Sequence, residues 1–106
     1  MTATDFIDNK APQLAVYGKA FLSDELEFHE VQLYLWDTLE EWQLLNQTGD
    51  AQTETEKVFW HLLHSFNTWP GSTLRGNQYL RKQIHDCCNF LSLGGRMPNG
   101  CIGIRP

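Results

Sequence analysis

Apolar residues recur at intervals of three and four positions along most of this chain, which is the spacing of one face of an α-helix. The pattern is clearest over residues 24–46, where the predicted inward stripe consists of Phe28, Val31, Leu35, Leu39 and Trp42. Valine and isoleucine are few, and the alternating apolar and polar residues typical of β-strands are absent. The periodicity therefore predicts an all-α protein.

Start and stop signals around these segments predict about four helices, over residues 12–22, 24–46, 53–69 and 77–93. Pro12 suits the first turn of a helix, because the N–H that proline lacks would have no partner there. Asp24 and Glu27 resemble a capping box, and Thr53 and Glu56 form a T-x-x-E box. Short connections between such helices favour an antiparallel bundle.

The segments outside these helices are rich in turn residues. Gln47–Asp50 is predicted as a turn, and Pro70-Gly71 and Gly94-Gly95 are predicted to end the third and fourth helices. We expect residues 1–11 to be a loose N-terminal segment. Residues 94–106 contain glycine, proline and a few apolar side chains, so we expect an extended C-terminal tail.

The composition is that of one folded domain of 106 residues. Six Phe, four Trp and three Tyr exclude a disordered chain, which would lack the apolar surface for a core. No apolar run approaches the roughly 20 residues that span a bilayer. Residues 1–10 lack the basic start and apolar centre of a secretory signal.

The three cysteines are not arranged as a disulfide framework, because their number is odd and Cys87 and Cys88 are adjacent. Free and largely buried thiols are typical of a reducing compartment. We therefore expect a cytoplasmic protein that does not interact with membranes.

Charge is divided unevenly between the two halves of the chain. Residues 1–56 contain 12 acidic and two basic residues, for a net charge of -10, whereas residues 57–106 contain one acidic and six basic residues, for a net charge of +5. One interpretation is that helices from the two halves pack together and their rims attract each other. The other is a molecule with two oppositely charged faces, which could also associate head to tail as a homo-oligomer.

The helix predicted over residues 24–46 has a second apolar side, opposite its inward stripe. Leu26, Leu33 and Leu44 lie there with Trp36 beside them, interspersed with carboxylates. We call this side the acidic–apolar face; its candidate partner-binding residues are Leu26, Glu30, Leu33, Trp36, Asp37, Glu40 and Glu41. The alternative is that the first helix or the tail covers this side in the folded bundle.

Trp60 is a further candidate for partner binding, because it lies outside the inward stripe of its helix, on the side of His64 and Asn67. The alternative is that its ring lies flat over a neighbouring helix. Secondary candidates are Arg81, Lys82, Arg96, Ile102 and Ile104. The basic residues among them would meet an acidic partner, and the tail would either add as a strand to a partner's sheet or fold back on the bundle.

Metal binding is not predicted, although His61 and His64 form an H-x-x-H pair and His85, Cys87 and Cys88 lie on the next helix. On a helical wheel Cys87 points to the core, His85 points away from it, and both His61 and His64 lie on the outer side of their helix. Neither an H-E-x-x-H motif nor a paired C-x-x-C motif is present. We therefore expect neither a metal nor a cofactor.

Catalytic residues are not identified either. Cys88 and His85 could meet on one helix, but no third group that would orient the histidine is evident. The sequence has no phosphate-binding loop, and its pI of about 5.2 argues against direct nucleic-acid binding.

The sequence thus predicts a small, non-enzymatic protein that binds or regulates another protein through the acidic–apolar face. The alternative is an inhibitor, of the phage or antidefence type, whose acidic N-terminal half imitates the phosphate row of a nucleic acid. A metal-binding or catalytic helical protein is the third hypothesis and has the weakest support.

Overall fold

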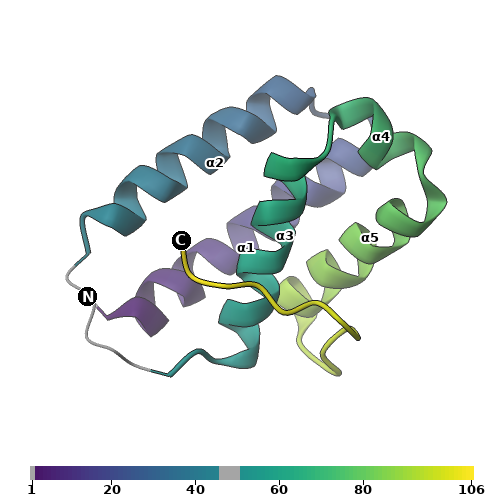
Figure 1. Ribbon diagram of the computed structural model, residues 1–106. Coiled ribbons are helices and arrows are strands. Elements are labelled where there is room, and N and C mark those ends of the chain that lie inside the picture. The colour runs from purple at the N-terminus through teal and green to yellow at the C-terminus, as the bar shows by residue number, and fades with distance from the viewer. Residues whose placement is uncertain (1, 46–50) are drawn as a thin grey trace.

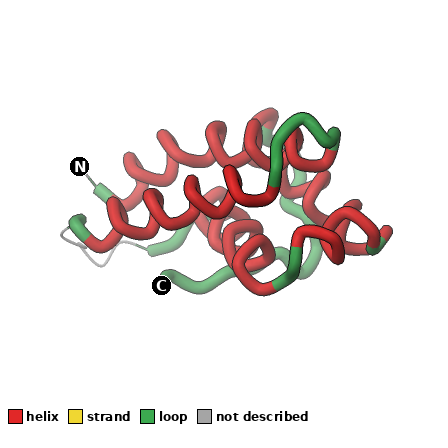
Figure 2. Tube along the Cα trace, turned by 90° about the horizontal axis from the view of Figure 1, so that it is seen from above, coloured by secondary structure: helices red, strands yellow, loops and turns green. Residues whose placement is uncertain are grey.

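The computed structural model describes residues 2–45 and 51–106, and within these ranges the chain forms five α-helices and no strand. The helices are α1 (Ala3–Leu22), α2 (Phe28–Gln43), α3 (Glu54–Thr68), α4 (Gly71–Gly76) and α5 (Gln78–Leu93). The all-α prediction is confirmed. Helix α1 is central, because α2, α3 and α5 all contact it, and α3 crosses in front of it (Figure 1). Seen from above, helices make up most of the trace (Figure 2).

Helix α1 begins nine residues before Pro12, so the prediction of a loose segment over residues 1–11 is wrong. Thr2 and Asp5 form a reciprocal capping box at its start. The side chains of Phe6 and Ile7 are buried in the core. Burial of these apolar side chains offsets the backbone hydrogen bond that the exposed Pro12 cannot donate within the helix.

The start of α2 also differs from the prediction. Asp24 has a φ of 60°, in the left-handed region, so it cannot be the first cap of a helix and the Asp24–Glu27 capping box is wrong. Helix α2 begins at Phe28 instead. The Arg75 guanidinium holds the preceding connection, because it donates to the carbonyls of Phe21 and Leu26 and lies 3.2 Å from the Asp24 carboxylate.

The later helix starts agree more closely with the sequence signals. The Thr53 hydroxyl accepts a hydrogen bond from the backbone N–H of Glu56 at the start of α3. The side-chain oxygen of Asn77 accepts one from the backbone N–H of Leu80 at the start of α5. The turn predicted at Gln47–Asp50 lies outside the described residues. The short helix α4, between Pro70 and Asn77, was not predicted as a separate element.

The core is made where α1 meets α3 and α5. Phe21 and Phe66 pack edge to face, and the Gly18 backbone lies directly against the Cys88 thiol of α5. A glycine inside α1 lowers its helix propensity, but here it allows close approach of two helices. No helix in residues 2–45 and 51–106 combines the length and apolarity that a membrane span requires.

Replacing Gly18 with alanine is expected to destabilise the protein by about 1–3 kcal/mol, because the new methyl group would overlap the Cys88 sulfur. Adding Cys88→Ala removes that sulfur and is expected to restore part of the loss. Urea denaturation of the single and double variants measures both effects. A Gly18→Ala variant as stable as the wild type would contradict this account of the α1–α5 contact.

Candidate functional site

The acidic–apolar face lies on α2, and its apolar residues differ in exposure. The exposed fractions are 40% for Leu33, 56% for Trp36 and 80% for Leu44. With 100° between successive residues of a helix, these three side chains fall within an arc of about 80°. Leu26 is not part of this exposed surface, because it precedes the helix and packs, partly buried, against the core.

The carboxylates of this face lie between its apolar side chains and along one flank of them. Glu30, Asp37, Glu40 and Glu41 are all exposed on α2, which contains no lysine or arginine. The Glu41 carboxylate lies 2.6 Å from the Lys10 ammonium of α1. The result is an apolar strip bordered by negative charge along one side of the molecule.

Trp60 is buried, with an exposed fraction of 0%, so the prediction that it is a surface anchor is wrong. Its ring packs edge to face against Trp42 and Phe59, with 4.9 Å between ring centroids in each pair. The indole Nε1–H donates a 3.0 Å hydrogen bond to the Glu56 carboxylate. A wheel of α3 alone missed this burial because the covering residues come from α2 and from the tail.

Residues 94–106 leave the end of α5 and cross α3, where polar contacts of residues 103–105 hold the tail (Figure 1). The Gly103 N–H donates to the Lys57 carbonyl at 2.9 Å, and an imidazole nitrogen of His64 lies 3.0 Å from the Ile104 carbonyl oxygen. The Arg105 guanidinium makes a two-point ion pair with Glu56, with 2.9 Å between Nη2 and Oε1.

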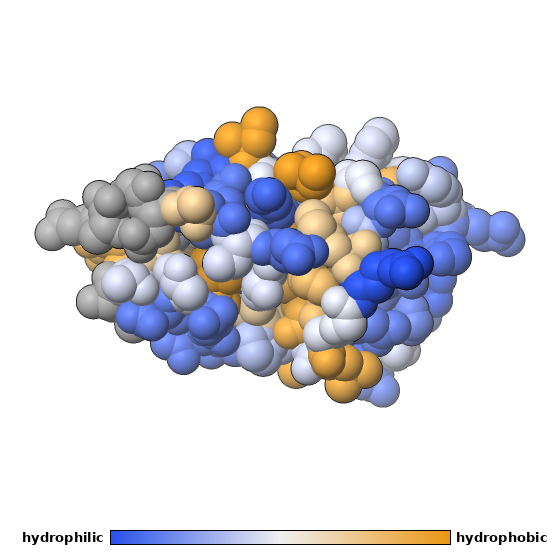
Figure 3. Space-filling model, turned by 90° about the horizontal axis from the view of Figure 1, so that it is seen from below, coloured by the Kyte–Doolittle hydropathy of each residue, from blue (hydrophilic) through white to orange (hydrophobic). Residues whose placement is uncertain are grey.

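The two isoleucines of the tail remain exposed, at 63% for Ile102 and 77% for Ile104. Figure 3 shows the molecule from below, where hydrophobic side chains form separate patches among hydrophilic ones. Cys101 and Gly103 alternate with these isoleucines and are buried against the bundle. One side of the tail therefore packs against the helices, and the other side faces solvent.

The predicted basic residues on α5 and in the tail differ in their contacts. Arg81 donates to the carbonyls of Leu22 and Arg75 at the end of α1 and of α4, and Lys82 pairs with Asp86 at 2.8 Å. Arg96 is exposed and lies with Lys82 along a groove of about 550 Å³ between α5 and residues 94–99.

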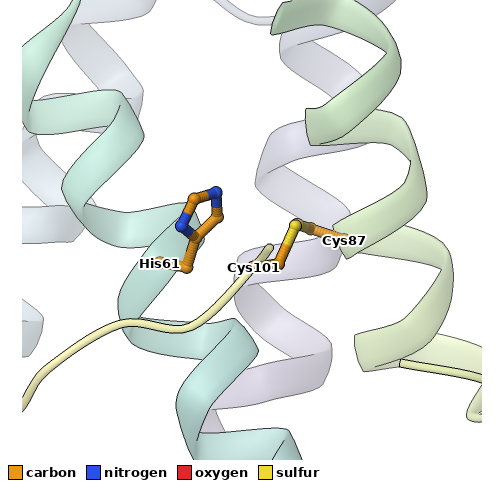
Figure 4. Close-up of side chains that lie close together, drawn as sticks. All are labelled: His61, Cys87 and Cys101. Atoms are coloured by element: carbon orange, nitrogen blue, oxygen red, sulfur yellow. The ribbon is translucent and has the colours of Figure 1, made fainter. Parts of the chain in front are cut away.

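A second cluster joins residues that the sequence pattern separates. One ligand atom each of His61, Cys87 and Cys101 lie within 4.8 Å of one another, and the two sulfurs are 3.5 Å apart. They come from α3, from α5 and from the tail, and they meet where the tail crosses between the two helices (Figure 4). His61 was expected on the outer side of α3; that expectation is wrong, because its Nε2 is buried and its imidazole lies in this cluster with Cys87 and Cys101.

The thiols of this region are held in their neutral form. Burial raises the pKa of Cys87, and burial likewise raises the pKa of Cys101. Burial raises the pKa of Cys88 to about 12, and this thiol packs against Gly18 while His85 is exposed. A neutral thiol is a poor nucleophile, so no cysteine here is activated for covalent catalysis.

Comparison of the chain with known protein families, with curated proteins and with solved structures found no match.

Proposed function

We propose that this protein is a non-enzymatic binding protein that takes up another protein on the acidic–apolar face of α2. Leu33 and Trp36 are its central contacts. The partner has an apolar surface bordered by lysine and arginine. The observation that carries the proposal is the exposure of Trp36 and Leu33 on one side of a helix that carries four carboxylates and neither lysine nor arginine.

The energetics favour the apolar residues as the source of affinity. Tryptophan is among the residues that most often dominate protein interfaces, and burying an exposed ring removes a large apolar area from water. The surrounding carboxylates accelerate and orient association with a basic surface and add less to the affinity itself. Trp36 and Leu33 are therefore the anchors, and Glu30, Asp37 and Glu40 select the partner.

Replacing Leu33 with aspartate, or Trp36 with alanine, is expected to weaken partner binding at least about tenfold, since truncating a central anchor often costs 2 kcal/mol or more. Folding stability is expected to change by only about 0.5 kcal/mol, because both side chains face solvent. Affinity capture from the protein's own cells identifies the partner, and calorimetric titration of the purified partner measures the change.

Leu93→Asp is the matched control, because Leu93 is exposed at the end of α5, a helix with few contacts to α2. This variant is expected to bind the partner like the wild type. Equal weakening by Leu33→Asp and Leu93→Asp would contradict the assignment of the site to α2. If the captured partner is a second copy of the chain, sedimentation at increasing concentration detects the oligomer.

Imitation of a nucleic acid is the other function that the charge of α2 supports. In that case binding depends on the carboxylates, so changing Glu30, Asp37 and Glu41 together to glutamine abolishes it, and affinity falls steeply as salt is added. Under our proposal the triple variant mainly slows association, and Trp36→Ala has the larger effect on affinity. Titrations of both variants at low and high salt separate the two functions.

A further inference from the structure

We propose that His61, Cys87 and Cys101 form a zinc-binding site that fastens the C-terminal tail to α3 and α5. These residues supply one imidazole nitrogen and two sulfurs, which are the donor types that zinc prefers in proteins. The site lies away from the acidic–apolar face and does not depend on the function proposed for it.

The geometry is close to that of a tetrahedral zinc centre. A zinc–sulfur distance of about 2.3 Å places two sulfur ligands about 3.7 Å apart. The sulfurs of Cys87 and Cys101 are 3.5 Å apart, and all three ligand atoms lie within 4.8 Å of one another. A movement of the imidazole nitrogen toward the sulfurs by about 1.3 Å at most, with little change between the two sulfurs, therefore brings all three ligand atoms onto one ion.

His61 provides an independent observation. Its Nε2 is buried and has no hydrogen-bond partner among the residues that the structure describes. A buried polar atom without a partner is costly in a folded protein, and a metal ion at this position would satisfy the imidazole. Hydrophobic packing of two cysteines alone would account for the sulfurs but not for this nitrogen.

Charge favours zinc over a monovalent thiophilic ion such as Cu⁺. Both cysteines are fully buried, and a buried site tolerates little net charge. Binding releases one proton from each thiol, so Zn²⁺, two thiolates and a neutral imidazole sum to zero. Cu⁺ with the same ligands would leave one uncompensated negative charge.

The fourth coordination position is left to a water molecule or a small ligand. In residues 2–45 and 51–106 no further His, Cys, Asp or Glu belongs to this group. Cys101 lines the groove of about 550 Å³ between α5 and residues 94–99, which gives the ion a route to the site. Three protein ligands with one open position are the pattern of zinc centres that bind water or substrate.

The test is titration of the reduced, metal-free protein with Zn²⁺ in competition with a chromophoric chelator, and with Co²⁺ as a spectroscopic probe. We expect one equivalent to bind, with a thiolate-to-cobalt charge-transfer band and the intense visible bands of tetrahedral cobalt. Cys101→Ser and His61→Ala are each expected to lower zinc affinity by about 100-fold or more. Loss of a residue that only hydrogen-bonds to a metal ligand already lowers metal affinity by about 10- to 100-fold.

Cys88→Ser and His85→Gln are the matched controls, because they alter the neighbouring thiol and imidazole of α5, which lie outside the cluster. Both are expected to keep the affinity of the wild type. Circular dichroism of each variant checks that lost binding is not lost folding. Three outcomes would overturn the proposal. The first is that the reduced wild type shows no saturable zinc binding, and the second is that the control variants lose as much affinity as the ligand variants. The third is that the protein prefers Cu⁺ over Zn²⁺ more strongly than the chelator does.

Oxidation to a Cys87–Cys101 disulfide is the competing chemistry for the same two sulfurs. Zinc binding that survives in reductant and requires His61 supports the metal site. Mass spectrometry that finds the disulfide in protein isolated from reducing cells, with no zinc uptake after reduction, contradicts it.

Discussion

Replacing Arg105 with alanine is expected to lower the free energy of unfolding by about 3 kcal/mol, because the change leaves the Glu56 carboxylate buried without its counter-charge. Glu56 is only 1% exposed, and Arg105 meets it through two nitrogens. The guanidinium also lies 5.8 Å from the centre of the Trp42 ring, so its removal loses packing as well as charge. Urea denaturation at neutral pH measures the loss.

Arg96→Ala is the control for this experiment, because Arg96 is an exposed arginine of the same tail. Its effect is expected to stay within about 0.5 kcal/mol. A Glu56→Gln variant keeps an acceptor for the Trp60 indole and removes the charge. In the Glu56→Gln, Arg105→Ala double variant we therefore expect a smaller loss than the sum of the two single variants, and strict additivity would contradict a direct pair.

The same pair makes stability depend on pH. Burial alone would raise the pKa of Glu56, but hydrogen bonds from Arg105 and Trp60 outweigh it and hold the pKa below its ordinary value of 4.5. A carboxyl group whose pKa is lowered in the folded state contributes stability at any pH above its ordinary pKa. That contribution is lost as the pH falls from the ordinary pKa through the lowered one. Below pH 4.5 we expect the wild type to lose more stability than Glu56→Gln, in denaturation series at falling pH.

Replacing Gly103 with alanine is expected to detach the tail and to cost about 3 kcal/mol, the upper end for an added methyl group in a packed site. A side chain at Gly103 would lie 2.7 Å from the Trp60 Cβ and would overlap the backbone of His61. The clash is with the helical backbone of α3, so we expect the tail to move instead. The tail then loses both the Gly103–Lys57 hydrogen bond and the burial of Cys101. Thermal unfolding measures the loss, and hydrogen exchange at Gly103 reports tail opening.

Gly76→Ala is the matched glycine control, since nothing lies within 4 Å of a side chain at that position and its φ is not positive. This variant is expected to be as stable as the wild type or slightly more stable, because alanine restricts the unfolded chain. If Gly103→Ala unfolds at the same temperature as Gly76→Ala, close docking of the tail is not what requires glycine at position 103.

The helices were predictable because their signals are local. The stripe Val31, Leu35 and Trp42 identifies the buried side of α2 without any knowledge of its neighbours. Local signals compete near the ends of helices. The capping box of Thr2 and Asp5, and not Pro12, starts α1, and Asp24 resembles a cap although it lies in a left-handed turn beside Arg75.

The candidate sites divide in the same way. The exposure of Leu33 and Trp36 follows from their position opposite the buried stripe of α2. Trp60 and His61 occupy the outer side of α3 by the same reasoning, yet Trp60 is buried and the Nε2 of His61 is covered. A helical wheel records one helix by itself, so it cannot show which side a distant segment will cover.

Periodicity, caps and glycine–proline breaks by themselves determined the all-helical character of the chain and the approximate extents of α2, α3 and α5. The residues of α2 by themselves determined its negative charge. These depend on interactions over three or four residues, which any sequence displays directly. Only the tertiary structure paired Glu56 with Arg105 across 49 positions and Cys87 with Cys101 across 14. Such contacts form because the tail has to bury Cys101 and bring Gly103 against α3, a choice that depends on the shape of the assembled bundle.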